Sequence, residues 1–250
     1  MNNINLASIK ENYDRDGYVF IPEFLNENGV ERINEALKDF IKNKVPVMTS
    51  SYVFYENNDD PCTLKQLQDI HRYEPYFANI LKGSKFEEIA AVLLEENVIG
   101  KNLEYFNKPP RIGKPTPPHQ DGYYFMLNTP KAITMWLALE DADEENGCVR
   151  YIPGSHMTGM RPHGRTKTLG FSQGITDYDE EDFAKEKAFP AKAGDLLIHH
   201  AMTIHRADGN QSDRSRRALG FIYFGASAKE DIEAKKAYQL RLSEERLRNA

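Results

Sequence analysis

The chain has 250 residues, of which 40% are hydrophobic and 28% charged, and its formal net charge at pH 7 is −6. This length suffices for one sizeable core, and barrel or jelly-roll domains of this size are commonly single. The mild negative charge leaves no basic surface for a nucleic acid, so we expect a small molecule as the partner.

The sequence contains no apolar run that approaches the ~20 residues of a membrane span. Its polar beginning, residues 1–5, lacks the apolar segment of a signal peptide. Two cysteines, Cys62 and Cys148, could form at most one disulfide, and we expect both to be reduced. These features predict a cytoplasmic protein with no membrane partner, either a monomer or a homodimer.

The first hundred residues are predicted to be mainly helical. Residues 16–22 indicate a turn and a short strand. A helix should follow, because apolar residues keep helical spacing from Val30 to Ile41 behind the capping candidates Asn26 and Asn28. A second helical stretch is predicted over about 63–97, and the helical N-terminal part is expected to cover about 1–100.

After residue 100 the hydrophobic period changes from helical to strand-like. Turn signals made of Pro, Gly and Asn separate short β-rich runs at 103–107, 133–139, 148–152, 195–199 and 218–224. This pattern predicts a mainly β protein with flanking helices, whose core over about 101–225 is a double-stranded β-helix, the jelly roll of cupin-like proteins. The charged tail at 229–249 predicts one exposed helix. We expect residues 1–250 to form a single domain.

A motif of metal-binding residue types stands at His119-Gln120-Asp121, with His205 far downstream. Residues i and i+2 of a strand point to the same side, so His119 and Asp121 can reach one ion while Gln120 points elsewhere. Two imidazoles and a carboxylate on one face of an octahedral ion leave open positions for a cosubstrate and O₂, as in non-haem Fe(II) oxygenases. By itself the His-x-Asp motif is weak, because polar residues of a surface loop give the same pattern.

Arg216 follows His205 by eleven residues. A guanidinium is permanently charged and forks onto a carboxylate with two parallel hydrogen bonds, which suits it to the distal end of 2-oxoglutarate. If Arg216 points into the roll, strand parity also places residues 218, 220, 222 and 224 inside and the alternate residues toward the helices.

Several segments resemble the phytanoyl-CoA dioxygenase family of Fe(II)- and 2-oxoglutarate-dependent enzymes. They are 106–110 (FNKPP), 136–142 (WLALEDA), 145–148 (ENGC), 152–156 (IPGSH), 193–200 (AGDLLIHH) and 205–218 (HRADGNQSDRSRRA). The resemblance covers about residues 10 to 225 in the family's order and spacing. It implies Fe(II), 2-oxoglutarate and O₂ as cofactor and cosubstrates, with ascorbate as the reductant in vitro.

The resemblance implies that the metal ligands, which are also the catalytic residues, are His119, Asp121 and His205. His200 falls where the family has a second histidine before the ligand, and we expect it to be a core or supporting histidine. Halogenases of related fold have Ala or Gly at the carboxylate position, whereas this chain keeps Asp121. Hydroxylation is therefore favoured over halogenation.

The 2-oxoglutarate pocket is predicted around Arg216 and Trp136, because the family's tryptophan at this position lines it. Core packing is an equal alternative for Trp136. Some members carry a serine that contacts the cosubstrate where this chain has Ala207, so water or another side chain must replace that contact. The candidate cosubstrate contacts are Arg216, Trp136, Thr134, Tyr105 and Gln120.

The family is too diverse to name the substrate. A cationic loop after residue 156 could fold over the open metal positions and grip an anionic group, or it could be solvated. Glu104 could meet an amine. The candidate substrate contacts are Glu104, Tyr123, Tyr124, Arg161, His163 and Arg165. We expect hydroxylation of a C–H bond of a small metabolite, anionic if the loop closes over it, with release of succinate and CO₂.

Two other classes of protein would also keep parts of this pattern. A non-oxidative cupin-type metalloenzyme would retain the metal ligands but would not need Arg216. A non-catalytic ligand-binding sensor would retain the pocket without turnover.

Overall fold

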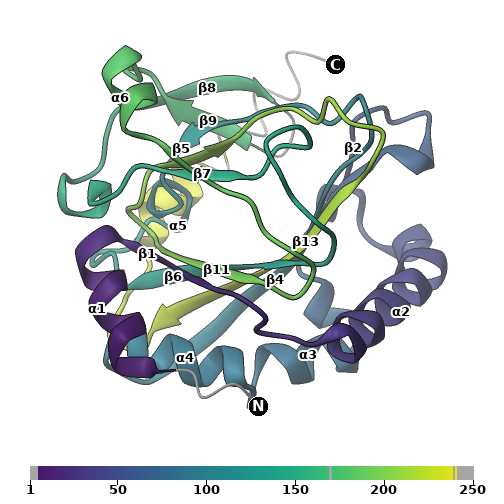
Figure 1. Ribbon diagram of the computed structural model, residues 1–250, viewed down its shortest axis with the longest axis horizontal. Helices are drawn as coiled ribbons and strands as arrows, with labels where there is room; N and C mark the ends of the chain where they lie inside the picture. Colours follow the sequence, from purple (N-terminus) through teal and green to yellow (C-terminus); the bar gives the residue numbers. More distant parts are fainter. Residues whose placement is uncertain (1–4, 169–170, 239, 241–250) are drawn as a thin grey trace.

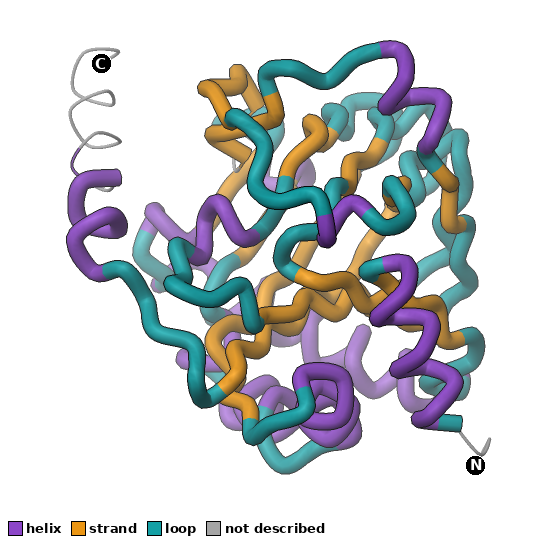
Figure 2. The backbone as a smooth tube through the Cα atoms, turned by 90° about the vertical axis from the view of Figure 1, so that its left-hand side faces the viewer, coloured by secondary structure: helices purple, strands orange, loops and turns teal. Residues whose placement is uncertain are grey.

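The computed structural model describes residues 5–168, 171–238 and 240. Two antiparallel sheets face each other, and helices cover the outer face of the larger sheet (Figure 1, Figure 2). This is the predicted jelly roll with flanking helices.

The larger sheet has seven strands, and every neighbouring pair in it is antiparallel. In spatial order they are β1 (Tyr18–Ile21), β11 (Leu196–His200), β6 (Ala132–Ala138), β13 (Arg216–Gly225), β4 (Val98–Lys108), β3 (Leu64–Leu67) and β2 (Val53–Tyr55). Every residue of the central strand β6 is buried, because helices lie on one side of it and the smaller sheet on the other.

The smaller sheet has four strands, in the order β10 (Lys187–Phe189), β7 (Val149–Tyr151), β12 (His205–Ala207) and β5 (Thr116–His119). A separate hairpin of β8 (His163–Thr168) and β9 (Phe171–Ile175) packs beside β5. Two short helices, α5 (Gly122–Phe125) and α6 (Glu180–Lys185), lie at this end of the molecule (Figure 1).

The outer helices are α1 (Leu6–Asp16), α2 (Glu27–Asn43), α3 (Pro75–Leu81) and α4 (Lys85–Leu94). Their apolar side chains and the outward residues of the larger sheet form one hydrophobic core. In it the rings of Phe86 and Phe221 stack with centroids 3.9 Å apart. Short 3-10 helices connect the elements, at Val45–Val47, Ser50–Tyr52, Pro61–Thr63, Ile70–Arg72 and Ser155–Met157.

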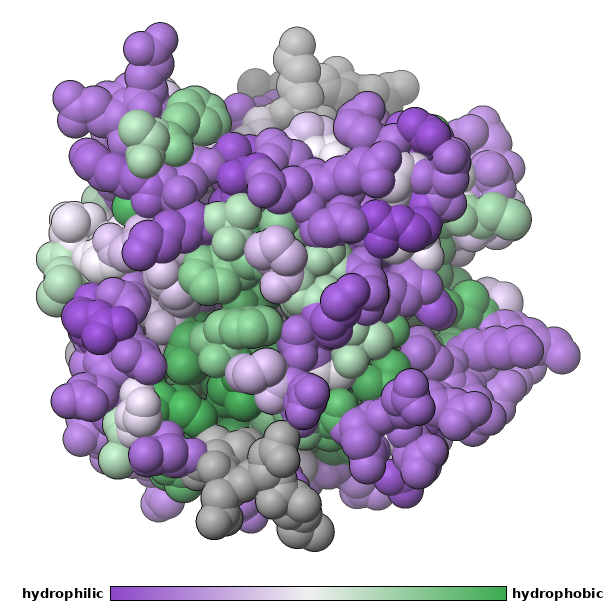
Figure 3. Space-filling model, viewed as in Figure 1, coloured by the Kyte–Doolittle hydropathy of each residue, from purple (hydrophilic) through white to green (hydrophobic). Residues whose placement is uncertain are grey.

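A second hydrophobic cluster lies between the two sheets. Among its members, Trp136 and Ala218 come from the larger sheet and Tyr151 from the smaller one. Hydrophobic residues are also visible in the middle of the face drawn in Figure 3, where hydrophilic residues surround them. The inner cluster therefore fills part of the space between the sheets, and the remainder is the cavity described below.

The first hundred residues differ in part from the prediction. Helix α2 begins as expected, and Asn26 caps it by accepting a hydrogen bond from the Gly29 backbone N–H over 3.0 Å. The single helix predicted over 63–97 is wrong: Leu64–Leu67 is a strand, and separate helices begin at Pro75 and Lys85. Pro75 and Gly83 interrupt the helical period, because each disfavours the interior of a helix. This part therefore contributes three strands, and the sheets extend beyond 101–225.

Strand parity along β13 agrees with the prediction. Leu219, Phe221 and Tyr223 belong to the helix-covered core, whereas Ala218 belongs to the inner cluster. Gly220 also faces inward, and a Cβ atom there would lie 2.6 Å from Cε2 of Phe106. Because glycine has no side chain, the Phe106 ring can pack against β13 at this position.

The tail is described only in part. Residues 232–238 are helical, and the rest of the helix predicted to end at 249 lies outside the described residues. No helix in the part of the chain that the structure covers is both long and apolar enough to span a bilayer. Cys62 and Cys148 are free thiols, as predicted.

Candidate active site

His119 and His205 lie directly opposite each other on β5 and β12, with ring centroids 4.1 Å apart. The Nδ1 atom of His119 is 2.8 Å from the Pro117 carbonyl oxygen, and that of His205 is 3.0 Å from the Thr203 carbonyl oxygen. A carbonyl oxygen accepts a hydrogen bond from Nδ1–H, so the proton is on Nδ1 and Nε2 of each ring is left as the acceptor. Both imidazoles therefore present the nitrogen that a metal ion binds.

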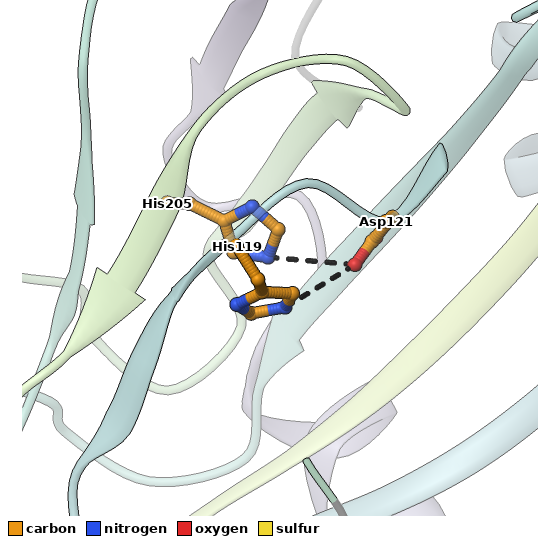
Figure 4. A group of neighbouring side chains, drawn as sticks. All are labelled: His119, Asp121 and His205. Carbon is orange, nitrogen blue, oxygen red and sulfur yellow. Dashed lines mark ion pairs between the residues drawn. The ribbon is translucent and has the colours of Figure 1, made fainter. Parts of the chain in front are cut away.

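Asp121 completes a cluster of three ligand groups (Figure 4). Its Oδ1 atom lies 3.4 Å from His119 Nε2 and 3.6 Å from His205 Nε2. The ligand atoms all lie within 4.8 Å of one another, which allows a single ion to contact all three. Strand alternation is not the cause, because β5 ends at His119 and Asp121 has helical angles at the start of α5. The turn into α5 brings the carboxylate to the histidines.

The second carboxylate oxygen of Asp121 has partners of its own. Oδ2 accepts a hydrogen bond from Thr134 Oγ1 over 2.5 Å and lies 3.1 Å from His199 Nε2. Nδ1 of His199 is in turn 2.9 Å from the Tyr151 hydroxyl. No sequence motif assigns His199 a role. Its parity with Leu197, which belongs to the inner cluster, could have indicated that it faces inward.

Burial and mutual proximity set the charges of the cluster. Burial alone would raise the pKa of the Asp121 carboxyl, but the His205, His119 and His199 imidazoles together hold it well below its ordinary value. Burial, with the neighbouring His119 and His199 rings, lowers the pKa of His205 well below that of a free imidazole. The cluster therefore offers a carboxylate and a neutral imidazole at neutral pH, which are the forms that bind metal.

A cavity of about 200 Å³ lies between the sheets and opens onto this cluster. Arg216 lines it and is 5% exposed, and its guanidinium lies over the Trp136 ring at 5.2 Å from the centroid. The Nε atom of Arg216 has no hydrogen-bond partner among the residues that the structure describes, and burial lowers the pKa of this group to about 10. Within the residues that the structure covers, no ion pair includes Arg216. A buried cation of this kind requires an anionic ligand.

Two lysines that are not among the predicted site residues, Lys108 and Lys65, also line the cavity. Lys108 lies opposite Arg216 in the β4–β13 pair, and its Nζ donates to the Lys114 carbonyl oxygen over 2.6 Å. Lys65 forms an ion pair of 3.2 Å with Glu56. Lys108 shares its parity with Glu104 on β4, a signal that could have predicted its inward direction. Burial and the neighbouring Arg216 charge hold the pKa of Lys108 well below its ordinary value, and Lys65 is paired with Glu56, so Arg216 is the main positive charge at this end of the cavity.

Glu104 lies four residues from Lys108 along β4 and gives the cavity an end of different character. Its carboxylate accepts hydrogen bonds from Gln66 Nε2 over 3.0 Å and from Asn102 Nδ2 over 2.6 Å. Burial, together with the negative charges of Asp121 and Asp69, raises the pKa of Glu104 to about 8, although these two hydrogen bonds act to lower it. Tyr124 also lines the cavity, and its hydroxyl donates to the Gln173 carbonyl oxygen.

Two predicted cosubstrate contacts are corrected by the structure. Tyr105 is buried in the helix-covered core, because alternate residues of β4 face opposite sides of the sheet. Gln120 is also fully buried away from the cavity: its amide donates to the carbonyls of Gly159 and Met202 and accepts from the Arg161 backbone N–H. Thr134 lines the cavity, but its hydroxyl is bound to Asp121.

Of the two alternatives for the loop after residue 156, the structure favours the one in which its cations do not face the metal positions. The Arg161 guanidinium forms ion pairs with Asp177 over 3.0 Å and with Asp182 over 2.6 Å, which turn it away from the cavity. His163 accepts a hydrogen bond from the Gln120 backbone N–H and stacks on Tyr123, with centroids 4.4 Å apart. Arg165 is exposed on β8. In the part of the chain that the structure describes, the residues that line the cavity do not include Tyr123, Arg161, His163 or Arg165.

Comparison with known proteins gives a family match over most of the chain. The family model described as Phytanoyl-CoA dioxygenase (PhyH) matches residues 13–218. Phytanoyl-CoA dioxygenase domain-containing protein 1 of Danio rerio is 34% identical over 160 residues, which are 61% of this chain and 54% of that protein. The chain thus spans about half of the zebrafish protein. Phytanoyl-CoA dioxygenase of Arabidopsis thaliana is 27% identical over 240 residues, covering 82% of this chain and 84% of that one.

A solved structure shares the architecture. It is the non-haem alpha ketoglutarate dependent carbocyclase SnoK from nogalamycin biosynthesis, which is 25% identical with a TM-score of 0.69. The match covers 89% of this chain and 85% of the carbocyclase. The likeness therefore extends over most of both chains.

Proposed function

The chain belongs to the phytanoyl-CoA dioxygenase family of Fe(II)- and 2-oxoglutarate-dependent oxygenases, and from this premise we propose that it hydroxylates a C–H bond of a small metabolite. One observation carries the proposal: a His-Asp-His cluster and an unpaired, buried arginine line the same cavity. The first can hold a metal ion and the second an anionic cosubstrate.

We propose that His119, Asp121 and His205 hold Fe(II). The donor set fits this ion, because two neutral imidazoles and one carboxylate leave other coordination positions open. Asp121 Oδ1 faces both imidazoles, while Thr134 and His199 hold Oδ2. These contacts keep the carboxylate in place before the ion binds, which reduces the entropy lost on binding.

We propose that Arg216 binds the distal carboxylate of 2-oxoglutarate, with Trp136 and Thr134 beside it. The orphaned Nε atom and the full burial of the guanidinium fit an anionic partner. Ala207 lines the same cavity and offers only a methyl group, so the serine contact of some relatives has no side-chain counterpart at that position. When bound, iron and 2-oxoglutarate supply the oxidising power of O₂, with release of succinate and CO₂.

The residues of the cavity have two tasks in such a reaction. They position a C–H bond of the substrate near the open metal positions, and the apolar rings of Phe106, Phe125 and Trp136 exclude water. The cavity of about 200 Å³ lies below the roughly 300–1,000 Å³ of typical ligand sites, which favours a small substrate. Arg161 is already paired with two aspartates, so the loop offers no free arginine at this position to bind an anionic group of the substrate.

The test is succinate release from 2-oxoglutarate with Fe(II), ascorbate and O₂. Arg216→Ala should raise the 2-oxoglutarate concentration needed for half-maximal release. The corresponding loss of binding free energy should be on the order of 2 to 4 kcal/mol, because a buried charge pair is lost. Metal binding should stay intact. Arg216→Lys should rescue only in part, since an ammonium lacks the planar fork.

Arg217→Ala is the matched control. This neighbour points to the other face of β13 and pairs with Glu140 over 2.8 Å, so its removal should leave the 2-oxoglutarate requirement unchanged. Equal effects of the two alanine variants, or no succinate from the wild type, would contradict the proposal. In a metabolite panel, a product that has gained one oxygen atom supports hydroxylation, whereas loss of two hydrogen atoms indicates cyclisation or desaturation.

A further inference from the structure

The cavity has two ends with opposite chemistry. Arg216 and Lys108 face each other in the β4–β13 pair, and Glu104 lies further along β4 with Gln66 hydrogen-bonded to it. Glu104 and Lys108 are four residues apart on β4, which is about 13 Å along a strand. The Arg216 guanidinium attracts a dicarboxylate to its own end, and Glu104 in its ionised form repels one. The end with Glu104 is therefore left for another ligand.

The groups at this end are hydrogen-bond acceptors without a cation. Glu104 is 7% exposed, and within the described part of the chain no ion pair includes it. The charged groups that influence it most, Asp121 and Asp69, are both negative. Gln66 is 3% exposed and lines the cavity; its Nε2 donates to Glu104, but its Oε1 has no hydrogen-bond partner.

Buried acceptors of this kind are costly unless a donor reaches them. The carboxylate retains lone pairs after accepting from Gln66 and Asn102, and Gln66 Oε1 is entirely free. An ammonium group carries three donors and one positive charge, so it can satisfy both oxygens and also compensate the carboxylate. The faces of Phe106, Tyr124 and Phe125, which line the same cavity, attract a cation as well.

We propose that Glu104 and Gln66 recognise a protonated amine on the substrate, with the ammonium donating to a Glu104 carboxylate oxygen and to Gln66 Oε1. The inference rests on the proposed function, because it places the amine in the substrate part of the same cavity. It names the substrate class as small amines. An ammonium bound here favours the ionised form of the Glu104 carboxyl and so opposes the effect of burial, which favours the protonated form.

Binding of three small probes of equal length tests the inference. Butylammonium, 1-butanol and butyrate differ in charge but little in size. They are titrated by ligand-observed NMR into protein loaded with 2-oxoglutarate and Ni(II), which replaces Fe(II) and prevents turnover. Butylammonium should bind at least about tenfold more tightly than 1-butanol, because hydrogen bonds to a charged group are stronger than neutral ones.

Glu104→Gln should remove most of this preference, since it keeps the shape of the side chain but not its charge. Glu88→Gln is the matched control: this residue is exposed on α4, outside the cavity, and the preference should persist. If Glu104→Gln does not fold, Gln66→Leu takes its place and should weaken butylammonium binding more than 1-butanol binding.

The inference is overturned if butylammonium fails to bind, if either other probe binds as tightly to the wild type, or if the folded cavity variant keeps the full preference. Its failure differs from failure of the proposed function. Succinate release by a wild type without an amine preference rejects only the amine. A wild type that prefers the ammonium but releases no succinate with Fe(II) rejects the proposed activity instead.

Discussion

Asp121 divides its two carboxylate oxygens between two sets of partners. Oδ1 faces the imidazoles of His119 and His205, and Oδ2 is held by Thr134 and His199. His199 is itself held by the Tyr151 hydroxyl. We infer that this chain of contacts orients the carboxylate for the metal ion, because a ligand held by outer partners is already in its binding geometry.

His199→Gln should weaken metal affinity by roughly 10- to 100-fold, the usual cost of losing an outer partner of a metal ligand. Titration with Ni(II), followed calorimetrically, measures the change. His200→Gln is the control on the same strand, because the His200 ring belongs to the other face of β11 and accepts from the Met202 backbone N–H. Equal losses in both variants would assign His199 a merely structural role.

Glu104 should make stability depend on pH. Burial, with nearby negative charge, raises its pKa from the ordinary 4.5 to about 8 in the folded protein. The folded state thus holds a proton that the unfolded state releases, and the stabilisation is complete below the unfolded pKa and is lost as pH rises through the folded one. Without metal, the wild type should lose stability relative to Glu104→Gln from about pH 5 to about pH 8.

Urea unfolding across this range measures that difference. Comparing the two proteins at each pH cancels the titration of all other groups that the substitution leaves unchanged. Glu88→Gln, an exposed change on α4, should show no such trend against the wild type. A difference between wild type and Glu104→Gln that stays constant with pH would show that the Glu104 pKa is not raised.

At the scale of elements, the site depends on the fit between β4 and β13. Glu104, Phe106 and Lys108 face the cavity from β4, and Arg216 and Ile222 face it from β13. Gly220 lies between these two, opposite Glu104, and Phe106 occupies the space that a side chain at this position would take. Close packing of the two strands therefore shapes the cavity wall.

Gly220→Ala should push the Phe106 ring, because the new methyl group would lie 2.6 Å from its Cε2 atom. Overpacking of this kind costs about 1 to 3 kcal/mol, and we expect a lower melting temperature and weaker 2-oxoglutarate binding. Both are measurable on the Ni(II)-loaded protein. The double variant with Phe106→Leu should recover part of the loss, since the smaller side chain frees the space. Additive losses in the double variant would exclude this contact as the cause.

At the scale of the whole molecule, the metal ligands connect distant parts of the fold. β5 and β12 supply the histidines, and Asp121 leads into α5 beside the larger sheet. We propose that the chain is a single domain, because the helices and the larger sheet share one core. Ligands bound between the two sheets should then stabilise the protein as one unit.

Ni(II) with 2-oxoglutarate, each at about 100 times its dissociation constant, should add about 2.7 kcal/mol per site to the stability. For a protein of this size that corresponds to a rise in melting temperature of roughly 5 to 10 °C for one site. A single calorimetric transition should shift, and a chelator should reverse the shift. Asp121→Ala should abolish the response to Ni(II), and two separate transitions would contradict a single domain.

Much of this protein is determined by local sequence. The cap at Asn26, the alternation of β13 and the residue types at His119, Asp121, His205 and Arg216 follow from short-range chemistry, and the sequence predicts them. The resemblance noted over about residues 10 to 225 agrees with the family match over 13–218. These features need no knowledge of which distant residues meet.

The tertiary structure decided what local patterns cannot contain. Leu64–Leu67 is a strand because β4 and β2 pair with it. The hydrogen bonds of this pairing outweigh the helical spacing of the apolar residues in the segment. Arg161 is neutralised by Asp177 and Asp182, and Gln120 is occupied by three backbone groups, so neither serves the cavity. His199 and Gln66 gain their places only through pairing of distant strands. The direction of a side chain follows from its own strand, but its partners depend on the segments that fold against it.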